Sequence, residues 1–166
     1  MKALRKMELI YILVFGLFVS FTINNVATVS AKEARERIEP FRVTTFAYKY
    51  DGNGSFSMTG RSFKHGVRFG PVYGSNSPSA SYNVKKYKKI TFVMGALDDP
   101  QFENSAELEI YFDKKLYKTY DLDVDMDIKK ININTKNKKL MKIVVTNAEG
   151  TIDLSGFGIA NVFGTK

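Results

Sequence analysis

The stretch Ala106-Glu-Leu-Glu-Ile-Tyr-Phe-Asp113 indicates the fold class of this chain. Apolar and polar residues alternate along it, and the side chains of an extended strand point alternately to its two sides. The buried side would carry Ala106, Leu108, Ile110 and Phe112, and the water-facing side would carry Glu107, Glu109, Tyr111 and Asp113. The stretch therefore predicts a β-strand with one side against a core.

Similar short runs follow one another to the C-terminus without a helical period. The expected strands are 41–50, 80–85, 88–95, 106–113, 116–124, 128–134, 140–147 and 157–163. Asp51-Gly-Asn-Gly54 is expected to form a turn after the first of them. Leu140-Met-Lys-Ile-Val-Val-Thr146 is mainly apolar on both sides, which is typical of a central strand. Eight or so short strands favour an all-β, jelly-roll β-sandwich.

The N-terminus has the three parts of a secretory signal peptide. Positive residues open it, an apolar run covers 9–21, and small residues end at Ala31, where cleavage is expected. The alternative is a retained membrane anchor, but a span needs about 20 apolar residues and polar residues interrupt this run. The sequence predicts a signal-peptide helix at 1–31, a charged linker at 32–40 and one β-sandwich domain at 41–166. The protein is expected to be secreted or associated with the cell envelope.

The chain is basic, with a formal net charge of +8. The first 31 residues contribute +2 of this, so the domain itself remains positive after cleavage. Lysines gather in short runs at 85–89, 129–130 and 136–139, and such runs either form a solvated surface or attract polyanions in a salt-dependent way. Outside the membrane we expect an anionic envelope polymer rather than nucleic acid, and membrane contact only through an uncleaved leader. The oligomeric state stays open.

Few residues offer catalytic chemistry. The sequence has no cysteine and a single histidine, His65, and it lacks a Gly-x-Ser-x-Gly motif. We therefore expect a binding protein rather than an enzyme, with His65 as a polar loop residue. An exported structural or protein-interaction scaffold is the alternative function, and a hydrolase that depends on His65 is a third.

A metal site has weak support in the sequence. The alternating aspartates at 121–127 lack the glycine and the glutamate of a helix-loop-helix calcium loop, so an edge strand with an acidic outer side is expected there. Asp98 and Asp99 begin a loop before Pro100, and they form a turn or, alternatively, a calcium-stabilised loop. We expect no cofactor otherwise.

The Gly- and Ser-rich segment 65–80 combines aromatic rings with hydrogen-bond donors in Arg68, Phe69, Tyr73 and Asn76. A sugar needs this combination, because its ring has an apolar C–H face and its hydroxyls pair with polar side chains. The alternative is that the aromatic residues only pack in the core.

The order of motifs between residues 59 and 163 resembles one known family. The motifs are Arg61-Ser-Phe-Lys-His-Gly-Val67, Ala80-Ser-Tyr-Asn-Val84, Lys86-Tyr-Lys-Lys-Ile-Thr-Phe92, Gly95-Ala-Leu-Asp98, Tyr111-Phe-Asp-Lys-Lys-Leu-Tyr117 and Leu140-Met-Lys-Ile-Val-Val-Thr146. This order resembles that of NPCBM/NEW2 domains, carbohydrate-binding modules with a galactose-binding-like jelly roll. Lys114 stands where the family has a turn glycine, and Asp153 and Phe157 stand where it has Asp-His and tryptophan. The resemblance implies glycan binding. Taken together with the rings and donors of segment 65–80, it gives His65, Arg68, Tyr73, Asn76, Asp153 and Phe157 as the expected ligand contacts.

Overall fold

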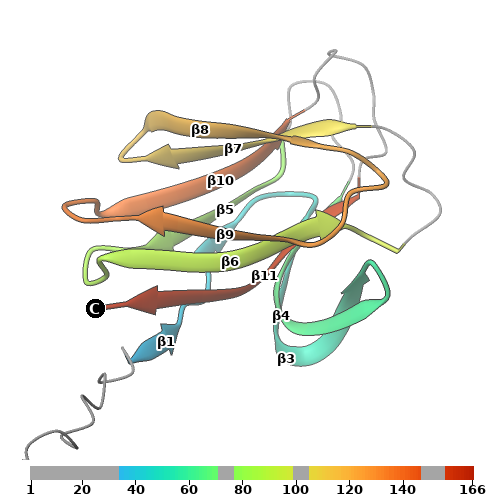
Figure 1. The fold of residues 1–166 in the computed structure, drawn as a ribbon, viewed down its shortest axis with the longest axis horizontal. Helices are drawn as coiled ribbons and strands as arrows, with labels where there is room; N and C mark the ends of the chain where they lie inside the picture. The colour runs from blue at the N-terminus through green and yellow to red at the C-terminus, as the bar shows by residue number, and fades with distance from the viewer. Residues whose placement is uncertain (1–33, 71–76, 99–104, 147–155) are drawn as a thin grey trace, which may run out of the picture. The chain divides into compact units, whose positions relative to one another are not determined.

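Residues 33–166 contain two antiparallel β-sheets, so the predicted all-β sandwich is confirmed (Figure 1). The computed structural model describes residues 34–70, 77–98, 105–146 and 156–166, so the expected signal peptide lies outside the described residues. No helix that could cross a membrane occurs in the part of the chain that is described.

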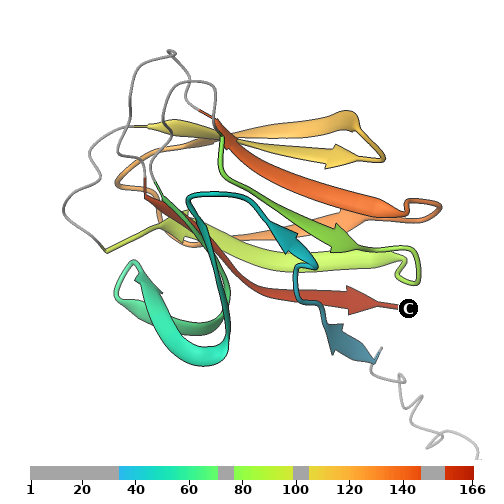
Figure 2. The same ribbon diagram turned by 180° about the vertical axis from the view of Figure 1, so that it is seen from behind.

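The first sheet has the strand order β3-β4-β11-β6-β9, and β1 pairs with the C-terminal residues of β11. The second sheet has the order β2-β5-β10-β7-β8. The strands of the first sheet are β1 (Arg35–Arg37), β3 (Ala47–Met58), β4 (Arg61–Phe69), β6 (Lys89–Ala96), β9 (Lys129–Asn134) and β11 (Phe157–Thr165). The second sheet contains β2 (Arg42–Val43), β5 (Ser79–Asn83), β7 (Ala106–Phe112), β8 (Lys115–Leu122) and β10 (Leu140–Thr146). Figure 2 shows the same two sheets from behind.

The core lies between the sheets and follows the alternation seen in the sequence. In β7 every second residue from Ala106 to Phe112 is buried, while the residues between them are partly exposed. In β10, which is central as predicted, Met141 and Val145 face the core and are fully buried. Burial of these apolar side chains on both sheets is the main force that holds the sandwich together.

The first part of the chain departs from the expected elements. Asp51-Gly-Asn-Gly54 is not a turn but an irregular part of β3, where Gly52 and Gly54 have positive φ and the pairing with β4 shifts between Asp51 and Phe56. Such a bulge bends a strand without ending it. The turn lies at Thr59-Gly60, a two-residue loop with both φ angles positive, as in type I′ hairpins. The sequence did not predict β4, which follows this turn.

The β3–β4 hairpin bends over the outer side of its own sheet (Figures 1 and 2). Its Phe56 and Met58 form a second small apolar cluster with Ala160 on β11. Gly158 permits this approach, because a Cβ atom there would lie 2.6 Å from the Phe56 ring. The hairpin therefore covers one half of the outer side and leaves the half around β1 open.

The expected linker at 32–40 contributes to the sheet. Arg35–Arg37 form β1 and pair with the last residues of β11, and the amide of Ile38 donates to the carbonyl of Val162 at 2.9 Å. Glu36 explains part of this docking, since its carboxylate lies 2.5 Å from Lys86 Nζ and 3.1 Å from Lys166 Nζ. The two lysines hold the pKa of Glu36 at about 2, well below its usual range.

Candidate functional site

The residues expected to contact a ligand are distributed over several places. Tyr73, Asn76, Asp99 and Asp153 lie outside the described residues. Phe157 is buried between the sheets, opposite Phe69 on β4, so its ring belongs to the core and does not face solvent. His65 is on strand β4 rather than in a loop, and its Nδ1 lies 3.2 Å from Oε1 of Glu39.

Arg68 and Asp98 line one depression beside the β3–β4 hairpin. It has a volume of about 450 Å³ and also contains the ring of Tyr50. The carboxylate of Asp98 accepts the amide hydrogen of Gly60 through both oxygens, at 2.9 and 3.1 Å, and thereby fixes the hairpin turn. This bond gives Asp98 a structural role, and no group of three potential metal ligands occurs among the side chains that the structure describes.

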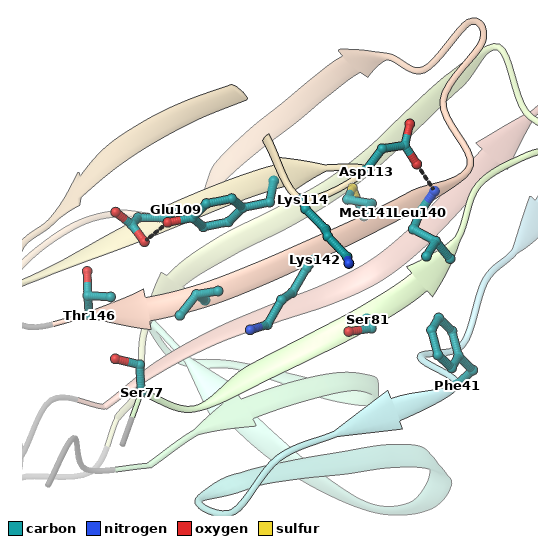
Figure 3. A pocket seen from close by; sticks show the side chains of 12 residues that line it. Phe41, Ser77, Ser81, Glu109, Asp113, Lys114, Leu140, Met141, Lys142 and Thr146 are labelled. Atoms are coloured by element: carbon teal, nitrogen blue, oxygen red, sulfur yellow. Dashed lines mark hydrogen bonds between the residues drawn. The ribbon is translucent and has the colours of Figure 1, made fainter. Parts of the chain in front are cut away.

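A second depression lies on the outer side of the sheet β2-β5-β10-β7-β8 (Figure 3). We call it the sheet-face groove, and its volume is about 510 Å³. It is lined by Phe41, Ser77, Ser81, Glu109, Tyr111, Asp113, Lys114, Leu140, Met141, Lys142, Val144 and Thr146. The volume lies within the range of about 300–1,000 Å³ typical of small-ligand sites.

Strand register places the central residues of the groove in one row. Lys142 on β10 lies opposite Ser81 on β5 and opposite Tyr111 on β7, so the three side chains point to the same side of the sheet. Figure 3 shows Ser81 and Lys142 projecting from neighbouring strands, with Phe41 at the edge. Phe41 is held there by its amide, which donates to the carbonyl of Ser81 at 3.0 Å.

The apolar part of the groove is unusually open to water. Phe41 is 61% exposed and Leu140 is 47% exposed, although both are large hydrophobic residues. Val144, which lies on the same side of β10 as Leu140 and Thr146, is only 7% exposed. The groove therefore combines a buried apolar floor with exposed apolar edges.

Some polar groups of the groove are already bound and others are not. The hydroxyl of Tyr111 donates to Glu109 at 2.7 Å, which fixes the tyrosine ring and raises the pKa of its hydroxyl. Asp113 accepts the amide hydrogen of Leu140 at 3.0 Å. Within the described residues, the side chains of Ser81 and Lys142 have no hydrogen-bond or ion-pair partner, so they remain able to bind a ligand.

Sequence reasoning did not select the groove residues, although the signal was present. The alternation of 106–113 placed Glu109 and Tyr111 on the water-facing side, and the second apolar side of 140–146 indicated an outer surface that is not purely polar. What the sequence could not give was the register that makes these two surfaces neighbours.

Comparison with known proteins agrees with this fold. The sequence profile of the NPCBM/NEW2 domain matches residues 24–162. A structure of CBM51-2, in complex with GlcNAc, and INT domains from Clostridium perfringens ZmpB has a TM-score of 0.63 at 15% identity, over 80% of this chain and 32% of that chain. CBM51 from Clostridium perfringens GH95, in complex with methyl-galactose, has a TM-score of 0.60 at 14% identity, over 80% of this chain and 100% of that chain.

These identities establish likeness of fold alone, and this chain spans about a third of the first structure. No curated protein sequence matches the chain. The family profile, in contrast, extends over most of the sequence and over the eleven strands of the described residues, except the last residues of β11. The chain therefore belongs to the NPCBM/NEW2 domain family.

Proposed function

We propose that this domain is a non-catalytic glycan-binding module and that its ligand lies in the sheet-face groove. The observation that carries the proposal is the row Ser81–Lys142–Tyr111 beside the exposed ring of Phe41. The row brings hydrogen-bonding groups and aromatic surface together on one open face.

The chemistry of the groove fits a sugar ring. A pyranose presents C–H groups on one side and hydroxyls around its edge, so it needs apolar contact and polar partners at the same time. Tyr111 and Phe41 supply the apolar contact, and the Lys142 ammonium and Ser81 hydroxyl supply donors. Because Glu109 holds the Tyr111 ring in place, little conformational entropy would be lost when a ligand stacks on it.

The relatives support this function at a coarser level. Two modules of similar fold are known in complex with GlcNAc and with methyl-galactose. Another similar structure holds two CBM51 modules together with an M60 catalytic domain, so modules of this fold can accompany an enzyme. His65, one of the expected ligand contacts, does not line the sheet-face groove, and its Nδ1 lies 3.2 Å from Oε1 of Glu39. The signal peptide expected at 1–31 would export the protein to reach envelope or extracellular glycans.

Glycan-array screening, followed by calorimetry with the best ligand and with GlcNAc and methyl-galactose, tests the proposal. Tyr111→Ala should weaken binding at least tenfold, because loss of a central aromatic contact in an interface costs about 2 kcal/mol and about 1.4 kcal/mol already corresponds to tenfold. Tyr48→Ala is the matched control, since Tyr48 is 52% exposed but lies on β3, in the other sheet.

Two results would contradict the proposal. One is the absence of any retained glycan on the array. The other is equal weakening by Tyr111→Ala and Tyr48→Ala, because the groove would then contribute no more than any exposed ring.

A further inference from the structure

The open half of the other sheet carries a second patterned surface. Pairing aligns Arg35, Thr165, Lys89 and Asn134 in one row across β1, β11, β6 and β9. The next row consists of Arg37, Phe163, Thr91 and Asn132. Residues paired in this way point to the same side of a sheet. We call these eight residues the cationic face.

The two rows contain three cations and no acidic residue. Glu36 lies between the two arginines in sequence, so its side chain points to the opposite side of β1, where it binds Lys86 and Lys166. Arg35 and Lys89 have no ion-pair partner among the described residues, and the guanidinium of Arg37 lies 5.4 Å from the centre of the Phe163 ring. The positive charge on this face is therefore not neutralised by neighbouring carboxylates.

The face is low at Thr165 and Thr91, and the larger ring of Phe163 lies on β11 beside Arg37. Thr165 and Thr91 are short and nearly buried, and Thr91 donates its hydroxyl hydrogen to Asn132 at 3.0 Å. Lys88, Lys89, Asn132, Ile133 and Asn134 surround a shallow depression of about 190 Å³. Long cationic side chains on β1 and β6 stand on either side of the threonine on β11.

We propose that the cationic face binds a linear polyanion, a polymer that carries phosphate or carboxylate groups along its chain. Adjacent strands are about 4.8 Å apart, so the β1 arginines and Lys89, which lie two strands apart, are separated by about 10 Å. This spacing is too wide for one oxyanion but suits successive charged groups of one chain. Arginine adds fork-shaped donors that fit both kinds of oxyanion.

The structure also shows which lysines of the runs in the sequence lie at the cationic face. Lys86 is bound by Glu36, and the ammonium of Lys138 lies 5.9 Å from the centre of the Phe112 ring, which belongs to the other sheet. Only Lys88 and Lys89 of these runs border the depression on the cationic face. The surface is separate from the sheet-face groove and does not depend on the glycan-binding proposal.

Binding of long-chain inorganic polyphosphate and of polygalacturonate to the full domain tests the inference. The variant Arg35→Gln/Arg37→Gln/Lys89→Gln should bind the preferred polymer at least tenfold more weakly than the parent. The control Lys115→Gln/Lys118→Gln/Lys138→Gln removes the same number of charges, two on β8 of the other sheet and one in the turn after β9 whose ammonium lies beside Phe112, and its affinity should stay within about threefold. Lys89→Gln alone, which leaves β1 untouched, should cause a smaller but measurable loss.

The comparison of the two polymers identifies the kind of anionic group that is bound. Binding of polyphosphate alone assigns phosphate, and binding of polygalacturonate alone assigns carboxylate. The inference is overturned if neither polymer binds or if the control variant weakens binding as much as the face variant. It is also overturned if inorganic phosphate competes as well as the polymer at equal phosphate concentration, because several linked charges should bind far more tightly than one.

Discussion

The hydroxyl of Tyr82 offers a sharp test of the packing of this domain. Tyr82 lies on β5 opposite Met141 and is fully buried. Its hydroxyl has no hydrogen-bond partner among the described residues, and burial raises its pKa. A buried polar group without a partner loses its bonds to water on folding and regains nothing. We therefore expect Tyr82→Phe to stabilise the domain, although removal of a tyrosine hydroxyl usually destabilises a protein.

The size of the effect is set by two opposing contributions. An unsatisfied buried hydroxyl destabilises the folded state by about 1–3 kcal/mol, so its removal is favourable. The small void that it leaves offsets part of this stabilisation, because lost packing costs about 24 cal/mol per Å³ of cavity. A net stabilisation of about 1 kcal/mol remains, which should raise Tm by about 3–5 °C in a domain of this size. Urea unfolding of parent and variant, with equal m-values, measures the difference directly.

Tyr111→Phe is the matched control, because it removes the same atom where the hydroxyl has a partner. It breaks the 2.7 Å bond to Glu109 and should leave stability unchanged or lower it by a few tenths of a kcal/mol. If Tyr82→Phe instead lowers stability by as much as about 1 kcal/mol, the Tyr82 hydroxyl is hydrogen-bonded in solution and is not an unsatisfied buried group.

Three further predictions concern local features. Gly66→Ala should cost about 3 kcal/mol or more in unfolding free energy, because its φ is +155° and a Cβ atom would lie 2.1 Å from the carbonyl oxygen of Ile159; a loss below about 1 kcal/mol would contradict this. Lys114→Gly should raise the free energy of unfolding by about 0.5 kcal/mol, as measured with urea. The φ angle of +73° strains the folded state by about 1–2 kcal/mol when the residue is lysine, and glycine relieves this strain. Glycine also stabilises the unfolded state by about 0.5–1 kcal/mol through its greater backbone entropy, which offsets part of the gain. The ion pairs of Glu36 should contribute fully to the stability of the domain above pH about 4.5, and this contribution should be lost as the pH falls to about 2. NMR should show the Glu36 carboxyl titrating near pH 2 in the parent and at a higher pH in Lys86→Gln.

The second half of the fold was predictable because the apolar residues of each sequence segment there are also the residues that pack in the core. From β5 onward the expected strands are present, with boundaries within about two residues, and the apolar alternation of 106–113 corresponds to the buried side of β7. The exception is the acidic segment 121–127, which was expected to be an edge strand: β8 ends at Leu122, and the amide of Met126 donates to the carbonyl of Asp123 at 3.0 Å in a turn. The N-terminal half was not predictable, because its strands lack a clear alternation of apolar and polar residues. β4 contains charged residues and Gly66, and β1 is a charged tripeptide that pairs only because β11 offers it a free edge.

The candidate surfaces show why a site is harder to predict than a fold in a β-sandwich. Alternation determines which side of its own strand a residue occupies, so the outward position of Tyr111 could be read from the sequence. It does not determine which residues lie beside it on neighbouring strands. Ser81, Lys142 and Tyr111 are separated by dozens of residues and meet only because β5 and β7 pair with β10 in one register. A slip of one residue would move Lys142 into the core and Met141 to the surface, so the same apolar packing that fixes the core also fixes the row.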